Sequence, residues 1–443
     1  MRTLKIILSA IVIVICLGLV TFAGIFLFSA LPREKSDQPE TSVSTDPPVQ
    51  EETPAETPSE PEAGGPDAPT DPEVPADTPE EPEQSEDAAD ELAGHTARIQ
   101  NYLAGMTLDE KIWQLFFTTP ESLTGVTTAT QAGDTTKAAL AERPVGGLCY
   151  FAANLVDAEQ TKTMLENTQS YAKTPLFLGL DEEGGRVSRA GSNEAMGVTH
   201  FEAAAVYGQR ADMAEVYQVG STLAQELGAL GFNLDFAPVA DVVTNPNNTE
   251  IGDRSYSSDP QVAEAMVSAM VDGLQRGSMV SCLKHFPGHG STETDTHEGK
   301  SVSNRTLEEL QSCEWVPFQA GIDKGAAMVM LSHLTNENFS NLPSDLSPEV
   351  VSHLREDLGF QGIIITDSHQ MGAITNYYDS GEAAVQALQA GVDMILMPMD
   401  LQAAFDGVKA AVEAGTLTEA RIDESVTRIL TVKYGFGILN LPD

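Results

Sequence analysis

The most constraining feature of this sequence is a regular alternation of short apolar runs and longer helical patterns from about Ala93 onward. Runs such as "PLFLGL" at 175–180, "VSCLKHF" at 280–286 and "GIIITD" at 362–367 are nearly continuous in apolar residues, as strands buried on both faces are. Seven strand–helix units are clear, and "KIWQLFF" at 111–117 would supply the strand of an eighth. Because such alternation implies a parallel sheet, we predict an α/β fold, a TIM-like (β/α)8 barrel, over residues 93–443.

Helix boundaries are marked as this fold requires. Ser347 followed by Pro348 is typical of an N-cap with proline at the first helical position. Gly391 and Gly415 stand where helices should end. A doubly wound open sheet is the competing architecture, and it fits less well because no glycine-rich phosphate turn opens the first unit.

The first 92 residues differ from the rest in composition. Residues 6–31 are apolar and uncharged, and the stretch is longer than the roughly 20 residues that cross a bilayer. A cleavable signal peptide would have a shorter apolar region of roughly 7–15 residues, so we predict an uncleaved membrane anchor over residues 1–33. Residues 34–92 are acidic and proline-rich without an aromatic residue, which predicts a disordered linker.

Charge bears on location and partners. Lysine and arginine lie on both sides of the apolar segment, so charge alone orients it weakly. A terminus of a few residues is more easily left in the cytoplasm, and we therefore expect a single-pass protein of the cell membrane with an extracellular catalytic domain. The formal net charge is −42 and no basic patch stands out, which argues against nucleic acid as a partner. We expect a monomer.

The cysteines predict neither a disulfide framework nor a metal centre. Of four cysteines, Cys16 lies in the apolar segment, and the remaining three cannot pair completely. Cys149 and Cys282 fall in predicted strands, where buried free thiols are expected. No spacing resembles a zinc site, so we expect no metal and no cofactor.

Ionisable residues end five of the predicted strands at the same relative point. A barrel enzyme places its chemistry at the C-terminal ends of its strands, so these side chains would converge in one bowl. Taken singly, each acid has a simpler explanation as the cap of the following helix. The residues are Asp181, Asp241, Lys284 with His285, His333 and Asp367.

Five motifs together resemble family 3 glycoside hydrolases, and within them the single-domain β-N-acetylglucosaminidases of the NagZ type. The resemblance covers roughly residues 107–439. Its most diagnostic part is "KHFPGHG" followed closely by Asp-x-His. The motifs are "DEEGGRVSR" at 181–189, "IGDRSY" at 251–256, "KHFPGHG" at 284–290, "DTH" at 295–297 and "ITDSHQMGAI" at 365–374.

The resemblance implies a retaining double displacement on GlcNAc-containing glycans such as peptidoglycan fragments (EC 3.2.1.52). Asp367 would be the nucleophile, His297 the acid/base, and Asp295 the residue that orients its ring. Histidine is unusual here, because most retaining glycosidases use a second carboxylate. The implied sugar-binding residues are Asp181, Arg189, Arg254, Lys284 and His285.

Several alternatives stay open. The chain could be a β-glucosidase or a GlcNAc phosphorylase of the same family, a non-catalytic wall-binding module, or a metal-dependent hydrolase using His285, His289 and His297. For His289 we expect a structural hydrogen bond, and for Arg254 an internal salt bridge is the alternative to sugar binding. His369 departs from the family pattern and would either contact the sugar or simply pack.

Overall fold

The computed structural model of the protein describes residues 86–292 and 299–442, with no side-chain detail before residue 93. These residues belong to the second of two units into which the chain divides, Glu80–Asp443. The predicted membrane anchor lies outside the described residues, as does most of the predicted linker. Helix α2, Glu86–Ala104, begins within the range assigned to that linker. Among the helices that are described, none is long and apolar enough to span a bilayer.

Eight short strands form one parallel sheet, and their order around the sheet is their order along the chain. Strand β12 pairs with β1 through Phe116 and Ile395, and a bridge between Ile365 and Met394 links its start to β11. The predicted α/β fold with a barrel-like parallel sheet is therefore confirmed. The strands are β1 (Phe116–Thr118), β2 (Gly147–Cys149), β3 (Phe177–Leu180), β6 (Leu234–Asp235), β7 (Val280–Phe286), β9 (Met328–Leu331), β11 (Ile363–Thr366) and β12 (Ile395–Leu396).

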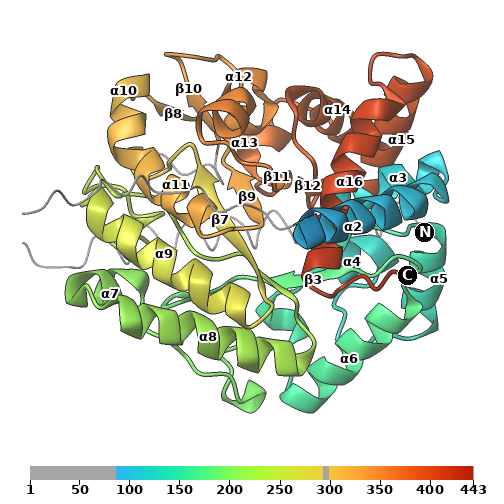
Figure 1. The fold of residues 1–443 in the computed structure, drawn as a ribbon, viewed down its shortest axis with the longest axis horizontal. Coiled ribbons are helices and arrows are strands. Elements are labelled where there is room, and N and C mark those ends of the chain that lie inside the picture. Colours follow the sequence, from blue (N-terminus) through green and yellow to red (C-terminus); the bar gives the residue numbers. More distant parts are fainter. Residues whose placement is uncertain (1–85, 293–298, 443) are drawn as a thin grey trace, which may run out of the picture. The chain divides into compact units, whose positions relative to one another are not determined.

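Helices follow the strands and lie outside the sheet, with α8 and α9 side by side (Figure 1). The predicted boundaries hold: Ser347 accepts a hydrogen bond from the Val350 amide, and Gly391 ends its helix at φ +109°. The main helices are α3 (Leu108–Gln114), α5 (Asp134–Glu142), α6 (Ala158–Tyr171), α8 (Met213–Leu230), α9 (Pro260–Arg276), α11 (Trp315–Asp323), α12 (Pro348–Ser352), α14 (Ser380–Ala390), α15 (Leu401–Glu413) and α16 (Glu419–Gly435).

The assignment of "KIWQLFF" to a strand is mostly wrong. Helix α3 runs through Gln114, and only the last two residues of the segment belong to β1. The helix starts because Thr107 and Glu110 form a reciprocal capping box, each side chain bonding the other residue's amide. Trp113 then stacks on Phe405 of α15 at 4.1 Å between ring centroids, which buries the apolar face of the helix.

Aromatic rings fill the barrel. Phe117 stacks on Phe177 and meets Phe236 edge to face at 5.2 Å between centroids. Gly147 makes room for Phe117, since a Cβ at this glycine would lie 2.6 Å from the ring. The predicted free thiols are confirmed: Cys149 and Cys282 are buried and unpaired.

One lysine is buried among these apolar side chains. Lys433 of α16 is fully buried, its Nζ donates to Gln114 Oε1 at 2.8 Å, and it lies 5.0 Å from the centroid of the Phe177 ring. Burial lowers the pKa of Lys433 to about 7. In an unfolded chain the same amine would titrate near 10.4.

This difference predicts a stability that rises with pH. Between about pH 7 and 10 the unfolded chain binds a proton that the folded one lacks, so raising the pH favours folding by up to roughly 1.4 kcal/mol per unit. Urea unfolding at pH 7.5 and 9.5 should show this rise in the wild type and a smaller one in Lys433→Met. The variant also loses the hydrogen bond to Gln114, which should lower its free energy of unfolding by the same amount at both pH values. Identical pH dependence in the two proteins would contradict a desolvated amine.

Candidate active site

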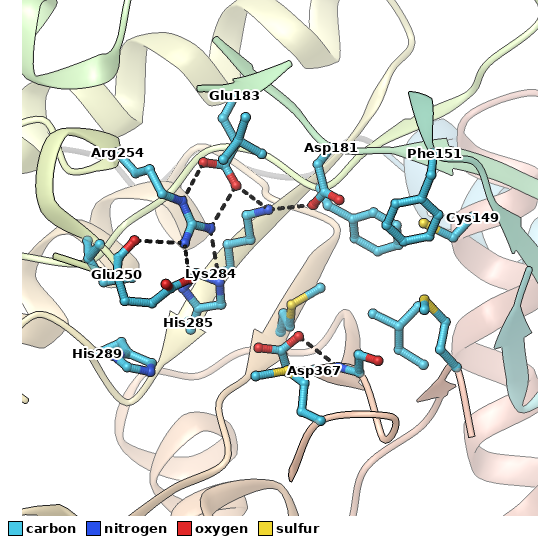
Figure 2. Close-up of a pocket in the computed structure, with 18 of the residues that line it drawn as sticks. Cys149, Phe151, Asp181, Glu183, Glu250, Arg254, Lys284, His285, His289 and Asp367 are labelled. Atoms are coloured by element: carbon cyan, nitrogen blue, oxygen red, sulfur yellow. Dashed lines mark hydrogen bonds and ion pairs between the residues drawn. The ribbon is translucent and has the colours of Figure 1, made fainter. Parts of the chain in front are cut away.

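All six predicted site residues that the structure describes line one cavity of about 400 Å³ (Figure 2). Asp181 follows β3, Lys284 and His285 lie in β7, and Asp367 follows β11, so their strands bring them together at the C-terminal end of the sheet. The remaining two arrive from loops between strands. They are Arg189, just after β5 (Val187–Ser188), and Arg254, in the short helix Gly252–Arg254. Asp295 and His297 lie outside the described residues, and their roles stay predictions.

Lys284 lies at the centre of the charged side chains. Its Nζ is 2.7 Å from Asp181 Oδ1 and 2.6 Å from Glu183 Oε1, and the side chain is only 2% exposed. Burial lowers the pKa of Lys284, but the two carboxylates outweigh it and hold that pKa above its ordinary value. The lysine is therefore a permanent cation in the cavity wall.

Arg254 forms the internal salt bridge that was the alternative expectation for it. Its guanidinium donates to both oxygens of Glu183 at 2.8 and 2.9 Å, and it also contacts Glu250. Arg254 nevertheless lines the cavity, so the salt bridge and a role in ligand binding are compatible. Burial raises the pKa of Glu183, but Lys284 and Arg254 more than offset it and keep the carboxylate ionised.

A tight hairpin brings Arg189 back to Asp181. Gly184 and Gly185 both have positive φ, +88° and +54°, which turns the chain between β4 (Glu182–Gly184) and β5. Arg189 Nη2 then lies 3.2 Å from Asp181 Oδ2. Burial raises the pKa of Asp181, but Lys284 and Arg189 hold it below its ordinary value. Arg189 also lies over the Phe151 ring, 5.4 Å from its centroid.

Asp241 holds two histidines of the site in place through its carboxylate. Its Oδ2 lies 2.7 Å from His285 Nδ1, and its Oδ1 accepts from the His289 amide at 2.6 Å. Because the carboxylate can only accept, it fixes the proton of His285 on Nδ1 and the orientation of the ring. His289 has the expected structural contact, with its Nδ1 3.1 Å from Thr292 Oγ1.

Asp367 faces the cavity from the side opposite the Lys284 and Arg254 cations (Figure 2). Its backbone amide donates to the Leu331 carbonyl, and its carboxylate accepts from the Ser368 amide at 2.7 Å. Burial raises the pKa of Asp367, while the nearby imidazoles of His285 and His333 bring it below the ordinary value. A fixed, ionised carboxylate at the edge of a cavity is suited to nucleophilic attack.

The sequence reasoning missed one residue of the site and left the role of another open. Glu183, which contacts both Lys284 and Arg254, stood in a quoted motif but received no role; its position two residues after Asp181 was the available signal. His369 does not line the cavity: it is buried, and its Nε2 lies 2.9 Å from Asp345 Oδ2. It therefore packs, which was one of its two expected roles.

The geometry does not support a metal centre within the described ranges. No group of three or more His, Cys, Asp or Glu side chains there is arranged to hold an ion. The proposed ligand set of three histidines includes His297, which lies outside those ranges.

The family model and the similar proteins agree on one family. The model of "Glycosyl hydrolase family 3 N terminal domain" matches residues 107–432. The chain is 31% identical to "Beta-hexosaminidase A" of Pseudoalteromonas piscicida over 319 residues, covering 65% of this chain and 53% of that protein. It is 30% identical to "Beta-N-acetylglucosaminidase/beta-glucosidase" of Cellulomonas fimi, covering 78% of this chain and 61% of that protein. The chain thus spans little more than half the length of these two relatives.

A solved structure agrees with these matches. The family 3 β-N-acetylglucosaminidase from Paenibacillus sp. str. FPU-7 superposes with a TM-score of 0.71 at 34% sequence identity. The match covers 76% of this chain and 65% of that one.

Proposed function

Because this chain belongs to glycoside hydrolase family 3, we propose that it is a retaining exo-β-N-acetylglucosaminidase acting on terminal β-GlcNAc of peptidoglycan fragments or related glycans. The observation that supports this most directly is the placement of Asp367 across one cavity from a cluster of fixed cations and carboxylates. The names of the similar proteins, β-hexosaminidase and β-N-acetylglucosaminidase, point to the same sugar.

The cavity suits a neutral, hydroxyl-rich ring. Lys284, Arg189 and Arg254 present charged donors. Asp181 presents acceptor oxygens, and its ion pairs with Lys284 and Arg189 keep the carboxylate ionised. Charge-assisted hydrogen bonds of this kind are shorter and stronger than neutral ones. In the proposed complex they hold the sugar hydroxyls and the acetamido oxygen, and so fix the anomeric carbon near Asp367.

The reaction then proceeds in two displacements. An oxygen of Asp367 attacks the anomeric carbon, the bond to the leaving oxygen breaks, and His297 gives that oxygen a proton. Water next attacks the glycosyl–Asp367 ester, His297 takes the water's proton, and the carboxylate leaves. Two inversions give net retention. Asp295 orients the His297 ring and stabilises its charged form.

The setting of this reaction is proposed from the sequence alone. Residues 1–33 would anchor the protein in the cell membrane, and residues 34–92 would hold the catalytic domain away from it on the outside. The substrate would then be wall material or its fragments outside the cell.

The full-length protein in mild detergent should hydrolyse 4-nitrophenyl β-GlcNAc with a kcat/KM at least roughly 100-fold above that for 4-nitrophenyl β-glucoside. The glucoside has no acetamido group, so the donors in the cavity that bind this group would be left without a partner. Proton NMR of muropeptide cleavage should show the β anomer of GlcNAc first. Added phosphate should give no sugar-1-phosphate, and a chelator should leave the rate unchanged. An α anomer appearing first would contradict the retaining mechanism, and binding of GlcNAc oligomers without turnover at any pH would indicate a binding module.

A further inference from the structure

A second cluster of ionisable side chains lies behind Asp367 and does not line the cavity. It consists of His333 after β9, Asp345 in the short helix Ser344–Leu346, and His369 after β11. All three are at most 2% exposed. The proposed mechanism uses none of them.

The two contacts of His333 suit a ring that carries a proton on both nitrogens: a hydrogen bond at Nε2 and an ion-pair contact at Nδ1. Its Nε2 lies 2.9 Å from the carbonyl oxygen of Ser368, and its Nδ1 is in ion-pair contact with Asp345 Oδ1 at 3.1 Å. A carbonyl oxygen and a carboxylate both accept only, whereas a neutral imidazole has one N–H to donate. A neutral ring would therefore turn a bare lone pair toward one of these two oxygens.

Asp345 is held in its ionised form from both sides. Its other oxygen, Oδ2, lies 2.9 Å from His369 Nε2, so each carboxylate oxygen faces an imidazole nitrogen. Burial raises the pKa of Asp345, but His333 and His369 lower it to about 2. Burial lowers the pKa of His333, and Asp345 outweighs it and raises that pKa to about 9.

The cluster is joined to the turn that presents Asp367. The carbonyl that accepts from His333 belongs to Ser368, the next residue along the chain. The turn is held on either side as well, since the Asp367 amide donates to Leu331 and the His369 amide donates to Leu396. The ring of His333 is thus hydrogen-bonded to the peptide unit between Ser368 and His369, which directly follows the one that joins Asp367 to Ser368.

We propose that His333 is a positioning residue that holds a permanent positive charge behind Asp367, with Asp345 keeping it charged and His369 holding Asp345 in place. This inference rests on the proposed role of Asp367 as the nucleophile. The charge favours the ionised carboxylate, which is needed both for attack on the sugar and for departure when water releases it. The hydrogen bond to Ser368 restrains the turn that follows Asp367.

Two carboxylates and one imidazole face His333. Asp345 and Asp367 both raise its pKa, as does the hydrogen bond to the Ser368 carbonyl, and the His369 ring lies 5.8 Å away between centroids. Tyr378 also lies near Asp345, and burial, Asp345 and Glu382 together raise its pKa, so the phenol stays neutral. On the cavity side, Asp367 is also influenced by the cation of Lys284.

Asp345→Asn is a nearly isosteric test. The amide nitrogen of the new side chain can donate to Nδ1 of a neutral His333, and its oxygen can accept from His369. His333 keeps its Nε2 proton for Ser368, so the hydrogen bonds at Ser368 and at His369 survive and the charge pair is lost. Asp357→Asn is the matched control, since Asp357 pairs with His353 at 2.7 Å on the surface, away from the cavity.

The acid limb of the kcat/KM profile for an aryl β-GlcNAc should move to higher pH by roughly half a unit to one unit in Asp345→Asn, because Asp367 loses a nearby positive charge. The control should keep the wild-type limb. An unchanged limb in a folded Asp345→Asn protein would overturn the proposal, since a purely structural role would lower the rate without moving the profile.

A second measurement is independent of activity. Nitrogen NMR of ¹⁵N-histidine-labelled protein at pH 7.5, with His333→Gln to assign the signal, should show two protonated nitrogens on His333 in the wild type and one in Asp345→Asn. A neutral His333 in an active wild-type enzyme would refute this inference alone. A charged His333 in a protein that cleaves no glycoside would instead refute the proposed function.

Discussion

Replacing Asp367 by Asn should lower kcat/KM for an aryl β-N-acetylglucosaminide by at least about 10⁴-fold, with the fold intact. Asparagine has the shape of aspartate but cannot form the covalent intermediate, because its amide is a poor nucleophile. The Ser368 amide that now donates to the carboxylate can donate equally to the amide oxygen. The loss should therefore fall on the chemical step, with little change in unfolding temperature.

A second substitution tests whether Asp367 is the nucleophile in a way that a contaminating enzyme could not reproduce. Asp367→Ala leaves a space beside the anomeric carbon, and azide should enter it and restore turnover of an activated aryl substrate. One inversion replaces two, so the product should be the α-glycosyl azide, identified by NMR. Asp253→Asn is the control, because Asp253 is exposed and its ion-pair partner is Arg186. Full activity in folded Asp367→Asn would refute the assigned role.

Much of the barrel follows from the local pattern of the sequence. Strand β7 has the predicted bounds, Val280–Phe286, as expected for a run that is buried on both faces of a parallel sheet. The segment that leads into β1 shows the limit of this reasoning. Residues 111–117 are apolar enough for a strand, yet a capping box at Thr107 starts a helix whose apolar face packs on α15.

The site was predictable where strands alone place its residues. Asp181 and Asp367 directly follow their strands and Lys284 lies near the end of β7, so the closed sheet brings them to one edge without further information. The pairing of Arg254 with Glu183 depends instead on two loops 71 residues apart in the chain, whose paths no local pattern specifies. The same holds for Asp345 and His369, which lie 24 residues apart. Sequence reasoning could note that His369 was unusual, but not which carboxylate it meets.

Replacing Lys284 by Met should have the largest effect on stability, a loss of about 3–5 kcal/mol in the free energy of unfolding. The methionine fills most of the space of the lysine stem but removes the cation between Asp181 and Glu183. Each carboxylate keeps one arginine, yet the two negative charges repel, and each raises the pKa of its neighbour where Lys284 now lowers it. Lys409→Met is the control, because Lys409 pairs with Asp109 at the surface and its loss should leave unfolding unchanged.

The same variant also separates a structural lysine from a sugar-binding one. If Lys284 donates to the sugar, kcat/KM per folded molecule should fall at least roughly 100-fold, measured well below the unfolding temperature with circular dichroism to count folded protein. A protein that loses stability but keeps wild-type kcat/KM would show that the cation only holds Asp181 and Glu183 together. Unchanged stability would show that water solvates the carboxylates once the lysine is gone. Because Lys284 joins Asp181 and Glu183 in the cavity wall, loss of stability and loss of activity are expected together.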